Sequence, residues 1–207
     1  MGPESLYRKL QQHLDRMPVG FPATKSGVEI RILQRLFTSE EAGIALELSA
    51  VPEPAAAIRK RFKPKLGLAE LTDALERMAA RGLILRISTE AGPRYGKLIL
   101  AVGIYERQVK RLTAEFESDV REYMGEAFGE ALHTGKTTQV RTVPVNRTVA
   151  VARSLSTYDD SRAYVQSCAG PFGVMPCICR RGKDLLGDPC RQTSLRENCL
   201  MIGPAAD

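Results

Sequence analysis

The sequence predicts an α+β fold that is mainly helical, and three observations lead to it. Apolar residues recur at helical spacing over much of residues 6–78, two runs of strand composition follow, and four of the five cysteines lie between positions 177 and 199. The expected order is an N-terminal winged-helix-like domain over 1–103, then a long connecting helix and an extended segment over 104–155. An irregular cysteine-rich C-terminal region over 156–207 completes the chain.

The first domain is expected to begin with a series of short helices. Leu6, Leu10 and Leu14 repeat at helical spacing and predict the first of them. The boundary signals of the others are two capping boxes, a proline at a start and a glycine at an end: Ser26 with Glu29, Thr38 with Glu41, Pro54, and Gly82 after a helix that carries Leu68 to Met78.

Two strands are expected after these helices. Residues 83–88 and 95–102 have strand composition and flank Gly92 and Pro93, which predicts a hairpin. Short helices followed by a hairpin are the order of a winged helix, a scaffold that serves both DNA readers and protein-docking modules. The helix before the hairpin carries Glu70, Asp73 and Glu76, where a groove reader presents basic or amide side chains. We therefore expect a structural or docking role ahead of specific DNA binding.

The middle of the chain is expected to hold one long helix. From Tyr105 to about Leu132, apolar residues fall on one side at helical spacing. That side either packs on the first domain or pairs with a second copy of the chain in a homodimer. Alternating valines predict extended structure over 140–152, and residues 159–168 predict a further helix.

The cysteines give the strongest functional signal. Cys177, Cys179, Cys190 and Cys199 follow the pattern C-x-C, ten residues, C, eight residues, C. Four thiolates from one loop can close a tetrahedral site for a 4Fe-4S cluster or for zinc. Basic residues around the loop suit a cluster that is net negative, and structural zinc sites more often use a C-x(2-4)-C knuckle. The sequence thus favours a 4Fe-4S cluster, with Zn as the alternative, and Cys168 is expected to be a small buried residue outside the ligand set.

Charge and hydropathy bound the partners. The net charge of +6 permits a nucleic acid, an acidic protein surface or neither. Five basic residues lie in the run Arg59, Lys60, Arg61, Lys63 and Lys65, which is either a solvated helix end or a docking patch. The longest apolar stretch, 98–105, is too short to span a bilayer, and the N-terminus carries no secretory signal. We expect a cytoplasmic protein without membrane association, whose thiols stay reduced.

Several segments also resemble a known family. LYRKLQQHLDRMPVGFPATKSGVEIRILQRLFTSEEA from residue 6, MPCICRRGKDLLGDPC from residue 175 and ENCLMIG from residue 197 are similar to the iron–sulfur "ferredoxin" proteins of anaerobic bacteria and archaea that carry an N-terminal winged-helix region. The resemblance implies that the four cysteines belong to a family motif. Members of that family continue into a further ferredoxin-type cysteine-rich region, so the resemblance implies a truncated or shortened member.

These observations lead to one expected function and two rivals. The first is a non-catalytic electron-transfer module or redox partner subunit, in which the winged-helix part docks a redox partner protein or a second copy. The second is a metal- or redox-responsive winged-helix transcriptional regulator, and the third is a structural zinc protein. The sequence contains no nucleophile elbow, phosphate-binding glycine loop or paired nucleophile and base that would indicate an enzyme.

Overall fold

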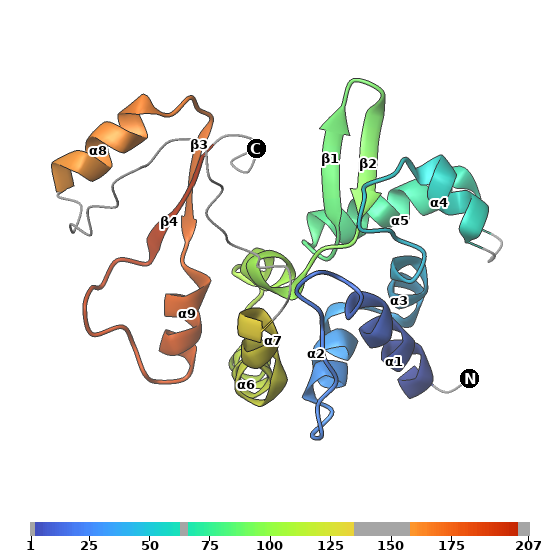
Figure 1. Cartoon of the computed structure of the whole chain (residues 1–207), viewed down its shortest axis with the longest axis horizontal. Helices are drawn as coiled ribbons and strands as arrows, with labels where there is room; N and C mark the ends of the chain where they lie inside the picture. The colour runs from blue at the N-terminus through green and yellow to red at the C-terminus, as the bar shows by residue number, and fades with distance from the viewer. Residues whose placement is uncertain (1–2, 63–65, 135–157, 203–207) are drawn as a thin grey trace.

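The computed structural model describes residues 3–62, 66–134 and 158–202. It is α+β and mainly helical, as predicted, with two small antiparallel sheets (Figure 1). One sheet pairs β1 (Leu85–Thr89) with β2 (Gly92–Gly96), and the other pairs β3 (Phe172–Pro176) with β4 (Glu197–Ile202). The two sheets lie on opposite sides of a central helical segment (Figure 1).

The N-terminal part is a cluster of five helices that packs under the first hairpin. The helices are α1 (Pro3–Leu14), α2 (Val28–Leu36), α3 (Ser39–Ala45), α4 (Ala55–Arg61) and α5 (Leu68–Ala80). Leu10, Ile32, Ile44 and Leu71 are fully buried where these helices meet. Each of these residues belongs to the apolar face of its own helix. Burial of these faces against one another stabilises helices this short.

The helix boundaries confirm most of the sequence signals and correct one. Thr38 and Glu41 form the predicted capping box of α3, and Pro54 precedes α4. The predicted box of Ser26 with Glu29 is wrong, since α2 begins after Gly27 in the left-handed region at φ 73°. Glu29 is buried and accepts a hydrogen bond from Arg8 at 2.8 Å instead. A buried carboxylate needs a charged partner, and this need overrides the local capping pattern.

The predicted first hairpin is present, but its turn and its strand ends lie at other residues than predicted. Its turn lies at residues 90–91, while Gly92 and Pro93, the predicted turn, belong to β2. The strand also ends at Gly96 rather than continuing to residue 102. Beyond Tyr95 the backbone turns toward residues 49–53, since the amide of Lys97 donates to the Ser49 carbonyl at 2.8 Å. This pairing with a distant loop takes the place of further hairpin bonds.

The long helix is confirmed over its larger part. Short turns η1 (Leu100–Ile104) and η2 (Glu106–Gln108) come first, and α6 (Ala114–Tyr123), η3 (Met124–Phe128) and α7 (Gly129–Thr134) then follow without a break. The predicted start at residue 105 is wrong, because the Thr113 hydroxyl caps the helix by accepting from the Phe116 amide at 3.2 Å. The apolar face packs on the N-terminal helices, where Tyr123 meets Phe21 with ring centroids 4.9 Å apart.

The C-terminal part contains α8 (Tyr158–Ser167), β3, α9 (Ile178–Leu185) and β4 (Figure 1). Helix α8 confirms the helix expected over 159–168, whereas the extended segment expected over 140–152 lies outside the described residues. The prediction of an irregular cysteine region is wrong in part. Pairing of β3 with β4 and the helix between them order most of it, and such long-range pairing leaves no local sequence signal.

Candidate functional site

Three of the four predicted ligands lie where β3, α9 and β4 meet. Cys177 is the N-cap residue of α9, directly after β3, and Cys179 follows in the first turn of that helix. The strand register sets Met175 of β3 opposite Cys199 of β4. The Cys177 amide also donates to the Arg196 carbonyl at 2.6 Å, which fixes the end of the hairpin. The turn that the C-x-C spacing requires is therefore the start of a helix.

The thiols of these three cysteines interact through Cys177. Burial first, and then the Cys177 thiol, raise the pKa of Cys179. The same two causes raise the pKa of Cys199. Thiolates packed together repel one another, so each favours its protonated form until a cation lies between them.

Cys190 lies apart from this group, on the loop between α9 and β4. Hydrogen bonds from the backbone amides of Gln192 and Thr193 lower the pKa of its thiol. Amide donors of this kind stabilise a thiolate, as they do around sulfur ligands of metal sites. The structure thus brings together Cys177, Cys179 and Cys199 and leaves Cys190 on the adjoining loop, where backbone amides lower the pKa of its thiol.

The described residues hold no closed metal site. Within residues 3–62, 66–134 and 158–202, no group of three or more His, Cys, Asp or Glu side chains is arranged to hold a metal ion. The donors nevertheless fit a thiophilic metal chemically, since four thiols in one short segment include three that already interact.

Ion pairs order the loop that carries Cys190. Arg196 and Asp184 form a two-pronged pair, with the second contact, Nη2 to Oδ1, at 2.9 Å. Arg180 donates to the Leu195 carbonyl at 2.9 Å. Two of the basic residues that the sequence suggested for a cluster environment therefore hold the loop itself. Sequence reasoning counted their charge but could not assign this role.

A cavity of about 250 Å³ lies beside Cys179, between η1, α6 and α9. Glu117 of α6, which is 2% exposed, receives hydrogen bonds there from Tyr105 at 2.6 Å and from Arg121 at 2.8 Å. Gly182 of α9 lies against the same carboxylate, where a Cβ would come within 2.3 Å of the Glu117 carboxyl carbon. These contacts join the cysteine region (residues 158–202) to the helical part (residues 3–134), and sequence reasoning missed them. The one available signal was the glycine in mid-helix.

The basic run that begins at Arg59 is partly structural. Arg61 pairs with Glu53 at 2.6 Å and donates to the Glu47 carbonyl at 2.8 Å. Arg59 bonds the Phe62 carbonyl at 3.4 Å, and Lys60 is exposed. Lys63 and Lys65 lie outside the described residues. A docking role for this run therefore falls to Lys60 and Arg59 among the basic residues that the structure describes.

Two of the three acidic residues on α5 serve the fold. Glu70 accepts from the Gly67 amide at 2.7 Å and so caps the helix. Glu76 accepts from Arg86 at 3.0 Å and from the Tyr95 hydroxyl at 2.5 Å, which ties the hairpin to α5. Asp73 is exposed. The acidic character of this helix is thus partly explained by local structure.

Cys168, which the sequence set outside the ligand set, is partly buried just after α8. None of the five cysteines forms a disulfide. Among the described residues, no helix is long and apolar enough to cross a membrane. In comparisons with known proteins, no family model, no curated protein and no solved structure matches this chain.

Proposed function

We propose that this chain is an iron–sulfur protein in which Cys177, Cys179, Cys190 and Cys199 ligate a 4Fe-4S cluster. It acts as an electron-transfer module or as a redox partner subunit. The observation that carries the proposal is the placement of Cys177, Cys179 and Cys199 at the junction of β3, α9 and β4, where the Cys177 thiol interacts with the other two. Such a cluster supplies one-electron transfer, and cysteine thiolates are its usual ligands.

The fourth ligand in this proposal comes from the loop between α9 and β4. Cys190 would be this fourth ligand, and hydrogen bonds from the backbone amides of Gln192 and Thr193 favour its thiolate. Arg181 and Arg191 are exposed around the site and offset the charge of four thiolates. Zinc remains the alternative metal because it accepts the same tetrahedral thiolate set.

The helical part has a docking role in this proposal. Helices α3, α4 and α5 followed by the β1–β2 hairpin have the element order of a winged helix, which supports assignment of that scaffold. Its partner is a redox protein or a second copy of the chain. The regulator that uses the same scaffold on DNA is the weaker candidate, since Glu70 and Asp73 are exposed on the helix that would face the groove.

Metal analysis of the anaerobically purified 207-residue chain tests the proposal. We expect iron and acid-labile sulfide in equal amounts, about four of each per chain, and a broad visible absorption that bleaches on reduction. A colourless protein with one zinc per chain would assign the site to structural zinc. Protein that binds neither metal after reconstitution would remove the cysteine site from consideration.

A further inference from the structure

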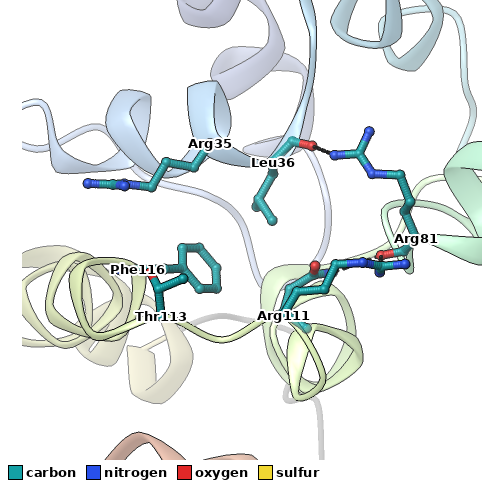
Figure 2. A pocket seen from close by; sticks show the side chains of 7 residues that line it. Arg35, Leu36, Arg81, Arg111, Thr113 and Phe116 are labelled. Atoms are coloured by element: carbon teal, nitrogen blue, oxygen red, sulfur yellow. Dashed lines mark hydrogen bonds between the residues drawn. The ribbon is translucent and has the colours of Figure 1, made fainter. Parts of the chain in front are cut away.

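A second cavity lies on the helical part. It measures about 290 Å³ and is formed where α2, the end of α5, η2 and the start of α6 meet (Figure 2). Its charged and apolar walls come from three arginines and two apolar side chains: Arg35, Arg81, Arg111, Leu36 and Phe116. No cysteine and no acidic residue lines it. In size it falls at the lower end of small-molecule sites, near 300 Å³.

Two of the three arginines are already neutralised. Arg35 pairs through Nε with Asp119 at 2.8 Å. Arg81 pairs with Glu41 at 2.6 Å and donates to the Leu36 carbonyl at 2.8 Å. These contacts leave the carboxylates outside the lining and hold both guanidinium groups in place. The two arginines therefore carry little net charge of their own.

Arg111 differs from both. Its Nη1 donates to the Arg81 carbonyl at 3.3 Å, and none of the ion pairs in the described part of the chain includes it. Figure 2 shows its side chain at the same end of the cavity as Arg81, with the guanidinium of Arg35 at the other end. Arg111 keeps further N–H donors beyond the one used, since a guanidinium carries five.

The surroundings of Arg111 add to its positive charge. A neighbouring cavity of about 540 Å³ is lined by Arg107, Lys110 and Arg111, again without an acidic residue in its lining. Arg111 thus lies between two cavities whose charged lining is basic throughout. An oxyanion beside it meets an uncompensated cation and a fork of donors that matches carboxylate or phosphate geometry.

We propose that the cavity of Figure 2 binds a small organic anion. Its carboxylate or phosphate group binds Arg111, beside Arg81, and its apolar body packs on Leu36 and Phe116. Leu36 and Phe116 separate the two charged ends of the cavity. A bare ion bound at one end would leave these two apolar side chains without a contact, whereas an organic anion would cover them. The proposal is independent of the cysteine region, because no cysteine lines this cavity.

Calorimetric titration of the full chain tests this proposal, with phenyl phosphate, benzoate and inorganic phosphate as probes at low ionic strength. We expect phenyl phosphate or benzoate to bind at least about tenfold more tightly than inorganic phosphate, since burying a phenyl ring contributes more than 1.4 kcal/mol. The tighter of the two organic probes identifies the head group. Equal or tighter binding of inorganic phosphate would overturn the apolar part of the site, and no binding of any probe would overturn the whole proposal.

Variants of Arg111 locate the binding. Arg111→Gln should lower the affinity for the preferred probe by about tenfold or more, because a charge-assisted hydrogen bond is lost. The affinity of Arg111→Lys should fall between those of the wild-type protein and Arg111→Gln. Arg59→Gln is the matched control, since Arg59 likewise bonds one backbone carbonyl but lines neither cavity. Thermal melts establish that each variant is folded. Unchanged affinity in a folded Arg111→Gln, or an equal loss in Arg59→Gln, would rule out this site.

Discussion

Gly182 of α9 lies directly against Glu117 of α6. A methyl group at this position would overlap the buried Glu117 carboxylate, which is held by Tyr105 and Arg121. The carboxylate cannot move aside without losing those two hydrogen bonds. Helix α9 can therefore pack on α6 because residue 182 is a glycine and has no side chain.

We predict that Gly182→Ala destabilises the protein by about 1–3 kcal/mol, the usual cost of overpacking. Urea unfolding followed by circular dichroism measures the change. Gly125→Ala is the matched control, because a Cβ at Gly125 would meet nothing within 4 Å. That helical variant should be neutral or more stable by about 0.5–1 kcal/mol. Equal stability of the two variants would mean that α9 does not rest on Glu117.

The ligand set gives a second prediction at this scale. Serine in place of Cys177, Cys179, Cys190 or Cys199 should sharply lower the bound metal, because a hydroxyl is a much poorer ligand than a thiolate. Cys168→Ser is the control and should retain it. Iron and zinc per chain, measured after identical reconstitution, give the result. A loss in Cys168→Ser as large as in the other four would show that the ligand set was chosen wrongly.

At the scale of elements, the β1–β2 hairpin depends on one carboxylate. Hydrogen bonds from the Tyr95 hydroxyl, first, and from Arg86 hold the pKa of Glu76 below its ordinary value. A pKa that is lower in the folded state stabilises the protein above the unfolded pKa of about 4.3, and this stabilisation is lost as the pH falls through the folded value. The attachment of the hairpin to α5 therefore weakens in acid.

We predict that Glu76→Gln removes this acid sensitivity. Between pH 5 and pH 3 the wild-type protein should lose an increment of at most about 1 kcal/mol, since the pair is partly exposed to solvent, and the variant should lack that increment. Stability against urea across this pH range is the measurement. Asp73→Asn, an exposed acid on the same helix, should keep the wild-type profile. Parallel profiles for wild type and Glu76→Gln would refute the prediction.

The elements themselves show what a sequence can predict. Caps with local partners, such as Thr38 with Glu41, were predictable because both partners lie within one turn. Ser26 and Glu29 have the same sequence pattern but form no capping box. Their side chains instead form hydrogen bonds with residues distant in sequence, Ser26 with Glu126 and Glu29 with Arg8. The predicted start of the long helix was wrong for a related reason. Apolar residues keep helical spacing through residues 105–112, but the helix begins only after Thr113, which caps it. Local rules hold where tertiary contacts do not compete with them.

At the scale of the whole molecule, the sequence could single out the cysteines as candidate ligands, which stays a prediction, but not their arrangement in space. The cysteine spacing identified Cys177, Cys179 and Cys199, which the β3–β4 register then brings together. The register itself depends on pairing across more than twenty residues, and no local pattern encodes it. The arginine cavity gave no sequence signal at all, because Arg35, Arg81 and Arg111 come from three separate elements.

Charge over the whole molecule gives the last prediction. The net charge of +6 attracts nucleic acid in general, while exposed Glu70 and Asp73 discourage a close fit of α5 to a groove. Any DNA binding should therefore be weak, independent of sequence and quickly lost as salt rises. Fluorescence polarisation with unrelated duplexes, titrated with salt, measures this. Tight binding that selects one sequence at physiological salt would favour the regulator instead.

The contact between the loop before α2 and the long helix also sets an order of events during synthesis. The amide of Lys25 and the hydroxyl of Ser26 bind Glu126 at 2.8 and 2.5 Å, and Tyr123 packs on Phe21. A ribosome that has made only the first hundred residues has supplied one side of each contact. Tyr123 can pack on Phe21, and so complete the packing of the N-terminal helices, only after the long helix has left the exit tunnel. Their final packing is an event late in translation, although their sequence is made first.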